Sequence, residues 1–211
     1  MNIRLLLICI CVYTGSVYAG DPGQPKYLGI EHGLSNNAVT CIYQDHNGFM
    51  WFGTYDGLNR YDGYSFKIFR NVIGDSASLN DNHIYTIEAD AGHRLWIGGA
   101  KGISIYNPAR SDFSSPLYRA WNTHIVQPIK EGVGVVKSIN QGSFILAGTQ
   151  NIGLVVFEKN NAPGIQIPLY DFKGREVTYN VTAVQPDPSQ KIAWVFVRQA
   201  GFVYTIWQQK H

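Results

Sequence analysis

From residue 26 onward, short runs of β-branched and aromatic residues alternate with polar turns that contain glycine. The first four runs span residues 39–44, 49–54, 58–61 and 65–69. The intervening Asp45–Gly48 and Asp56-Gly57 segments favour tight turns, because Asp and Asn bond local backbone and Gly accepts a positive φ. This pattern predicts four short antiparallel strands, and no segment shows a competing helical periodicity.

The same pattern returns 45 residues later. At this offset Leu34 aligns with Leu79, and Asp45 aligns with Asp90. The glycine and aromatic positions align as well: Trp51 with Trp96, Gly53 with Gly98, Gly57 with Gly102 and Tyr61 with Tyr106. Repeats of four short strands at this period are typical of β-propeller blades, so the sequence predicts an all-β fold.

Two weaker copies follow. Residues 144–149 match the Trp-x-Gly-Thr stretch, with Gly148 and Gly153 at the glycine positions, and a fourth copy runs from Tyr179 through Trp194 to Tyr204. We therefore expect a partial β-propeller, an open arc of about four four-stranded antiparallel blades. The expected segments are a signal peptide (1–19), a leader with an orphan strand (20–33), blade 1 (34–75), blade 2 (76–125), blade 3 (126–163) and a partial or degenerate blade 4 (164–211).

The recurring tryptophans have two interpretations. Trp51 and Trp96 can fill the space between neighbouring blades, with Gly53 and Gly98 allowing close backbone approach. Alternatively, both indoles can stack on sugars. Recurrence in register favours the inter-blade core, because core positions of repeat proteins behave in this way.

Residues 33–39 together with the spacing Asp45-x-x-Gly48-x-x-Trp51-x-Gly53-Thr54-x-x-Gly57-Leu58-x-x-Tyr61 resemble the two-component regulator propeller repeat. The likeness extends over roughly residues 26–205 and weakens along the chain. The resemblance implies the periplasmic sensor region of a hybrid two-component system from Bacteroidetes-type bacteria. It also implies an oligosaccharide ligand, and remaining blades and signalling domains as partners in a longer sensor. This sequence departs from that plan because it contains no kinase or receiver motif, and we expect a truncated sensor.

Blade topology predicts that the loop before each first strand and the turn after each second strand share one face, the upper face. Polar residues there can hydrogen-bond sugar hydroxyls. The candidate ligand-binding residues are Tyr55, Asp56, His83, Lys101, Asn36 and Asn151. Asn37 and Asn82 recur in register, which favours backbone capping over ligand binding.

Catalytic motifs are absent from the sequence: it has no nucleophile elbow, zinc-protease helix or phosphate-binding loop. Its 6 histidines lack metal-ligand spacing, so we expect no catalytic residue, metal or cofactor. The open alternatives are a stand-alone secreted propeller that binds carbohydrate or protein, and a propeller lyase. A lyase would need a His–Tyr or acid pair converging at the mouth of the central channel.

The N-terminus predicts export. Arg4 precedes the apolar run 5–12, and Val17-Tyr18-Ala19 supplies small residues for cleavage after Ala19. An uncleaved anchor is the alternative. Cleavage would leave Cys41 as the only cysteine and lower the net charge from +2 to +1, because Arg4 is the sole charged residue of 1–19. The mature chain then lacks an intramolecular disulfide, a membrane-spanning run and the basic excess that binds nucleic acid. We expect a periplasmic or secreted protein with a small, buried thiol at Cys41.

Overall fold

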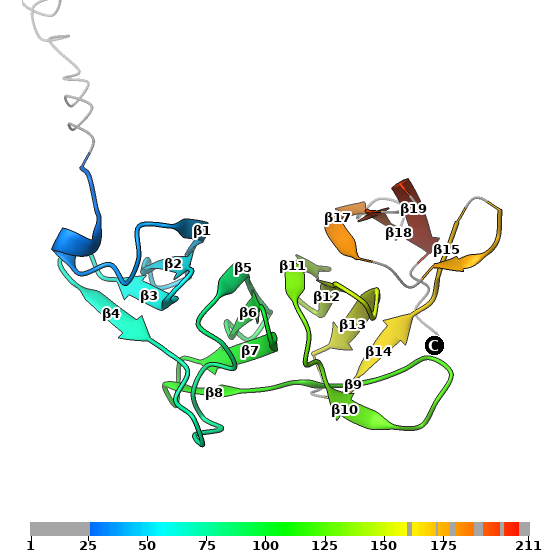
Figure 1. The fold of residues 1–211 in the computed structure, drawn as a ribbon, viewed down its shortest axis with the longest axis horizontal. Helices are drawn as coiled ribbons and strands as arrows, with labels where there is room; N and C mark the ends of the chain where they lie inside the picture. The colour runs from blue at the N-terminus through cyan, green and yellow to red at the C-terminus, as the bar shows by residue number, and fades with distance from the viewer. Residues whose placement is uncertain are drawn as a thin grey trace, which may run out of the picture.

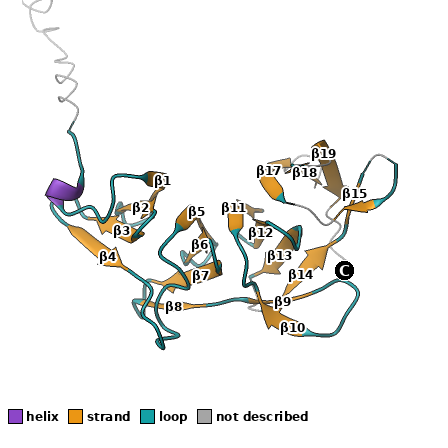
Figure 2. Ribbon diagram, viewed as in Figure 1, coloured by secondary structure: helices purple, strands orange, loops and turns teal. Residues whose placement is uncertain are grey.

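The computed structural model describes residues 26–159, 162–171, 173–177, 180–187, 192–198 and 201–206. The predicted signal peptide, the cleavage site after Ala19, and Tyr179 lie outside these residues. Strands and loops make up nearly all of the described chain, and the 3₁₀ helix η1 (Ile30–His32) precedes the first strand (Figure 2). Among the described residues, no helix has the length and apolar character needed to cross a membrane.

The first two sheets have the predicted four strands in sequential antiparallel order. Blade 1 consists of β1 (Val39–Gln44), β2 (Met50–Thr54), β3 (Gly57–Tyr61) and β4 (Phe66–Phe69). Blade 2 consists of β5 (Ile84–Ala89), β6 (Leu95–Gly99), β7 (Gly102–Asn107) and β8 (Asp112–Ser114). Gly57 and Gly102 open the third strands with φ of 110° and 106°, a conformation that L side chains rarely adopt.

The third sheet is larger than predicted. Blade 3 consists of β11 (Val133–Ile139), β12 (Phe144–Thr149), β13 (Leu154–Glu158) and β14 (Gly164–Ile167). Two further strands, β9 (Leu117–Arg119) and β10 (Val126–Pro128), extend it to six in the order β10-β9-β14-β13-β12-β11. The β9–β14 pairing is parallel, whereas the other pairings of this sheet are antiparallel.

Consequently, two expected blade boundaries differ from the sheet pairing. β9 lies in the range expected for blade 2, and β14 lies in the range expected for blade 4, yet both belong to the third sheet. The physical reason is that the outer edge of β14 offers free backbone groups, which β9 satisfies. The four strands of blade 3 therefore span residues 133–167 rather than 126–163.

The last sheet has three described strands, β17 (Val181–Asp187), β18 (Ile192–Val197) and β19 (Gly201–Ile206), which form blade 4. A small ribbon of β15 (Leu169–Tyr170) and β16 (Glu176–Val177) precedes it. Residues 26–29 join no sheet and continue into η1, and the orphan strand expected within residues 20–33 stays a prediction.

The four blades lie side by side in an open arc, with β1, β5, β11 and β17 along its concave side (Figure 1). Each of these inner strands begins with a β-bulge at the same place, for example between Val39 and Cys41 and between Ile84 and Thr86. Because the bulge occurs at the same strand position in all four sheets, equivalent residues of the four blades can be aligned. The fold is therefore a partial β-propeller, as the sequence predicts.

Hydrophobic clusters fill the spaces between neighbouring blades. Trp51 is 1% exposed and packs with Ile84, Leu95 and Ile97 of blade 2, while Trp96 is 4% exposed and packs with residues of blade 3 such as Val133. Leu146 occupies the tryptophan position of blade 3 and packs against blade 4. The repeat tryptophans are thus inter-blade core residues, with no surface available for a sugar.

Candidate functional site

Backbone hydrogen bonds join the loops of the predicted upper face. Gly57 N, in the β2–β3 turn of blade 1, donates to Asn82 O in the loop before β5 at 2.7 Å. Ala100 N, in the β6–β7 turn, donates to His83 O in the same loop at 3.0 Å. Turns of two blades therefore meet at one loop, residues 79–83, and fix its position over the junction of blades 1 and 2.

Tyr55 and His83 meet at this junction. Their rings make an edge-to-face contact with centroids 4.2 Å apart, and Tyr85 at the start of β5 lies 4.9 Å from His83. Tyr55 is 55% exposed, so this aromatic cluster of Tyr55, His83 and Tyr85 presents a ring to solvent. His83 Nε2 is buried and has no hydrogen-bond partner in the described structure, which is uncommon for a native polar atom.

Asp56 and Lys101, by contrast, are held by ion pairs. Arg70 Nη2 lies 2.8 Å from Asp56 Oδ2, and this guanidinium holds the pKa of the Asp56 carboxyl below its usual value. Lys101 Nζ lies 3.0 Å from Asp81 Oδ2. A ligand that used either charge would first have to compete with its partner, although exposed pairs of this kind are weak.

The asparagine candidates bond to the protein itself. Asn36 Oδ1 accepts from Ala38 N at 2.7 Å, and Asn151 Nδ2 donates to Glu131 Oε2 at 2.6 Å. Asn37 Oδ1 accepts from Ile30 N, and Asn82 Oδ1 accepts from Asn71 N, so both cap backbone of the preceding segment. These contacts favour the backbone-capping interpretation of the recurring asparagines.

The structure therefore brings two of the six candidates, Tyr55 and His83, into ring contact, whereas the other four bond to residues outside this aromatic cluster. Sequence reasoning missed Tyr85, which has no aromatic counterpart in the repeat, since position 40 of the first copy is Thr. It also missed Arg70, Asp81 and Glu131, the charged partners of the other candidates. These charged contacts depend on which loops meet in space, and the repeat pattern of the sequence does not show which loops meet.

Other potentially reactive side chains, a cysteine and two histidines, pack against neighbouring residues of the fold. Cys41 packs partly buried against the blade 1–blade 2 core, and burial raises the pKa of its thiol. His46 and His93, in the lower turns of blades 1 and 2, stack with ring centroids 3.9 Å apart. Within the described residues, no three His, Cys, Asp or Glu side chains gather as a metal site would require.

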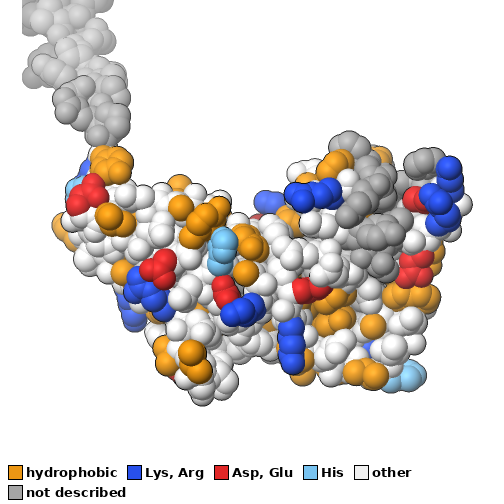
Figure 3. Space-filling model, viewed as in Figure 1, with side chains coloured by type: hydrophobic (Ala, Val, Ile, Leu, Met, Phe, Trp, Pro, Cys, Tyr) orange, Lys and Arg blue, Asp and Glu red, His pale blue; other side chains and the backbone are white. Residues whose placement is uncertain are grey.

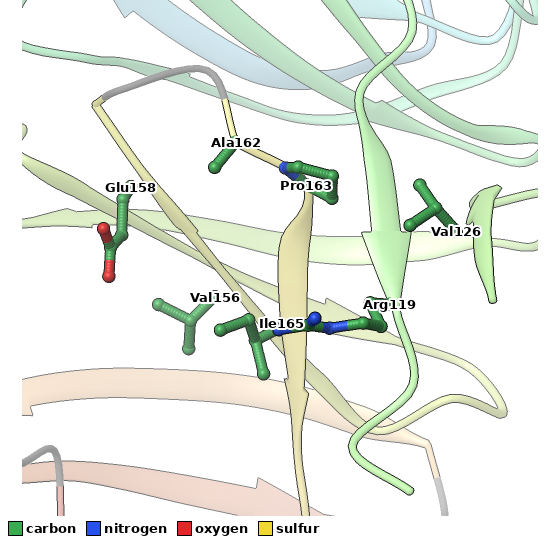
Figure 4. Close-up of a pocket in the computed structure, with 7 residues that line it drawn as sticks. All are labelled: Arg119, Val126, Val156, Glu158, Ala162, Pro163 and Ile165. Carbon is green, nitrogen blue, oxygen red and sulfur yellow. The ribbon is translucent and has the colours of Figure 1, made fainter. Parts of the chain in front are cut away.

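Two cavities lie elsewhere, on either side of the β13–β14 hairpin. One of about 300 Å³ is largely apolar; in Figure 4 the Arg119 side chain lies beside Ile165, with Val126 across from them. The other, of about 410 Å³, lies between blades 2 and 3 and includes Arg94 and Arg110 in its lining. Neither cavity is lined by a predicted ligand-binding residue, and β9 contributes Arg119 to the first cavity and Leu117 to the second.

Four register-matched sheets and inter-blade tryptophans define the class as a β-propeller repeat protein. Residues 33–56 match the family described as Two component regulator propeller. A stretch of 48 residues is 52% identical to Histidine kinase P4 of Formosa agariphila, covering 23% of this chain and 4% of that protein. Residues 33–56, in blade 1, are thus similar to a two-component regulator propeller repeat.

Solved structures share the fold. The extracellular domain of the hybrid two component system BT3049 from B. thetaiotaomicron matches with a TM-score of 0.65 and 24% identity, over 85% of this chain and 24% of that domain. That of BT4673 from the same organism matches with a TM-score of 0.59 and 20% identity, over 84% of this chain and 22% of that domain. This chain therefore shares the fold of these extracellular domains and spans about a quarter of their length.

Proposed function

We propose that this chain is a periplasmic ligand-sensing segment of a hybrid two-component sensor, and that its ligand is an oligosaccharide bound at the upper face. The observation that carries the proposal is the aromatic cluster of Tyr55, His83 and Tyr85, situated beside a two-component regulator propeller repeat. The cluster is set on paired backbone turns from two blades, so its geometry depends on how the blades sit together.

The chemistry of the cluster suits a sugar. The apolar face of a pyranose can stack on the exposed ring of Tyr55, as amphipathic aromatic side chains commonly allow. Hydroxyl groups at the sugar rim can reach polar atoms of the flanking loop, including Asp81 and Lys101. A neutral oligosaccharide needs no net charge at the site, which agrees with the ion pairs that neutralise Asp56 and Lys101.

The mechanism that follows is a shift in blade packing. Tyr55 belongs to blade 1, whereas His83 and Tyr85 lead into blade 2. A ligand that binds all three rings favours the arrangement in which the two blades are closest. Such differential affinity for one arrangement is what a ligand needs in order to shift a conformational equilibrium.

The test is a glycan-binding screen followed by calorimetry on the purified chain. Tyr55→Ala and His83→Ala should each weaken binding at least tenfold, which corresponds to about 1.4 kcal/mol. Tyr64→Ala is the matched control, because Tyr64 is 94% exposed in the β3–β4 turn, away from the cluster. Equal binding by the wild type, Tyr55→Ala and Tyr64→Ala would refute the proposed site.

The lyase alternative deserves a direct test because a His–Tyr pair is present. The Tyr55–His83 contact joins ring edges and faces, and in the described structure no hydrogen bond links the phenol oxygen to the imidazole. General acid–base catalysis further requires each catalytic group to lie within hydrogen-bond reach of the substrate proton that it transfers, directly or through one water. We expect uronate-containing oligosaccharides to be recovered intact after incubation. Release of unsaturated sugars, lost in His83→Ala, would favour the enzyme instead.

A further inference from the structure

One side-chain nitrogen of the upper face has no hydrogen-bond partner. Among the residues that the structure describes, His83 Nε2 is the buried side-chain nitrogen or oxygen that makes no hydrogen bond. Native proteins pair the large majority of such atoms, because a buried polar group without a partner has lost its bonds to water and gained none. This exception calls for an explanation, such as a group that bonds the nitrogen in another state of the protein.

The backbone on either side of the imidazole is fixed. His83 N donates to Asp81 Oδ1 at 2.8 Å, and His83 O accepts from Ala100 N at 3.0 Å. Asp81 is itself paired with Lys101. Because both backbone groups of His83 are bonded, access to Nε2 depends on the side chains around the imidazole.

Tyr55 is the neighbouring side chain that has room to move. Its ring contacts the His83 ring edge to face, with centroids 4.2 Å apart. Figure 3 shows a histidine among hydrophobic side chains over the junction of the first two blades. Tyr55 stands in the tight turn between β2 and β3 and is 55% exposed, and in the described part of the chain its hydroxyl group makes no hydrogen bond. Tyr85, by contrast, lies within β5 and is only partly exposed.

The repeat does not require this pair of rings. At the junction of blades 2 and 3 the equivalent positions hold Ala100 and Gly132, neither of which has a ring. That junction is nevertheless well packed, with Trp96 in its core. A pair that the fold can do without, and that leaves a polar atom unbonded, is better explained by binding than by packing.

We infer that Tyr55 is a lid over His83, and that a bound oligosaccharide moves the Tyr55 ring aside so that a sugar hydroxyl group bonds His83 Nε2. This inference rests on the ligand site proposed above and adds the atom that the ligand bonds. A hydroxyl group is a suitable partner, because it can accept from an Nε2–H or donate to the Nε2 lone pair. The displaced ring of Tyr55 remains available to stack on the sugar.

The first experiment uses the chain without a ligand and compares midpoints of urea unfolding. His83→Phe keeps a ring beside Tyr55 and removes the unbonded nitrogen, so the midpoint should stay equal or rise. His83→Ala also removes the ring contact and should lower the midpoint. A lower midpoint for His83→Phe would show that the imidazole is bonded in the free chain and would overturn the inference. If circular dichroism shows that His83→Phe is unfolded, the NMR experiment decides.

That second experiment measures the lid itself. Long-range proton–nitrogen NMR spectra distinguish Nε2 from Nδ1 of each histidine. Tyr55→Ala should shift the Nε2 resonance of His83, because water then reaches and bonds this atom, whereas Tyr55→Phe keeps the ring and should leave the resonance in place. His46 and His93, in the lower turns, are the unmoved references. The same Nε2 resonance in the wild type and both Tyr55 variants would refute the lid.

Binding separates this inference from the proposed function. With the oligosaccharide that binds best in the glycan screen as the probe, His83→Phe should weaken binding at least tenfold, because only the hydrogen bond is lost. Tyr55→Phe should bind like the wild type. Equal binding by the wild type and His83→Phe, with binding lost in Tyr55→Ala, would leave the proposed site standing and refute the hydrogen bond to Nε2. If no oligosaccharide binds, the proposed function and the role of Nε2 fail together, whereas the two ligand-free experiments still decide the lid.

Discussion

Trp51 Nε1 donates a hydrogen bond to Asp45 Oδ2 at 2.7 Å, which ties the inter-blade tryptophan of blade 1 to the turn that precedes its strand. The same bond recurs in blade 2, where Trp96 Nε1 lies 3.0 Å from Asp90 Oδ2. In both turns the other carboxylate oxygen accepts two backbone N–H groups, from Asn47 and Phe49 in blade 1. In blades 1 and 2, one aspartate thus orders a turn and satisfies a buried indole.

Replacement of this aspartate should be costly. Asp45→Ala removes the acceptor of Trp51 and leaves the indole N–H without its partner in the core, so we expect a loss of about 2–3 kcal/mol in the free energy of unfolding. Asp62→Ala is the control, because Asp62 bonds the backbone of Tyr64 and Ser65 in an exposed turn without a tryptophan. Urea unfolding monitored by tryptophan fluorescence compares the two, and equal losses would contradict the role given to Asp45.

The close approach at Gly53 predicts a steric effect. In Gly53→Ala the new methyl group would meet Cys41 Sγ at 2.5 Å and Ile84 Cγ2 at 2.7 Å, so the blades must separate locally, at about 1–3 kcal/mol. Gly134→Ala makes the same chemical change in β11, where nothing lies within 4 Å of the added Cβ. Thermal unfolding should therefore show a clear loss for residue 53 and little change for residue 134.

Acid should weaken the Asp56–Arg70 pair. Arg70 lowers the folded-state pKa of Asp56, so the stabilisation is fully present above the unfolded-state pKa of about 3.9 and is lost as the pH falls through the folded value. Both side chains are about two-fifths exposed, which limits the effect to less than about 1 kcal/mol. Asp56→Asn should lower the urea midpoint slightly at neutral pH and match the wild type near pH 2, and a difference that grows in acid would reverse the assigned sign.

The thiol of Cys41 should react slowly in the folded chain. Burial raises its pKa, and the thiolate is the reactive form, so modification by a disulfide reagent at mildly alkaline pH should accelerate strongly in urea. Peptide mapping assigns the label to Cys41 rather than to Cys9 or Cys11. Rapid labelling of the native protein at Cys41 would instead indicate an accessible, reactive cysteine.

The repeat made most of the fold predictable. The Asp and Gly residues that recur at or near offset 45 predicted the strands of blades 1 and 2, because these residues act on local backbone regardless of the rest of the molecule. The β9–β10 hairpin could not be predicted in the same way. Its strands have three residues each, and β9 gains its partner from β14, far along the chain.

The candidate site was less predictable for a similar reason. Placing Tyr55 and His83 on one face needed only the repeat topology, whereas their ring contact depends on how two blades pack. Asp56 and Lys101 looked suited to ligands because they differ between copies, but each difference is matched by a partner elsewhere, Arg70 and Asp81. A comparison between repeats shows which positions vary, but it does not show that a charged residue elsewhere in the chain pairs with the varied one.

The parallel pairing of β9 with β14 constrains the order in which the sheets can form during folding. A protein that emerges N-terminus first presents residues 117–119 well before residues 164–167. Blades 1 and 2 can complete their sheets from consecutive segments, and β9 can pair with β10 early, but the β9–β14 pairing cannot form until the last strand of the third sheet has appeared. Protection of this pairing from hydrogen exchange would therefore report that every strand of blade 3 is in place.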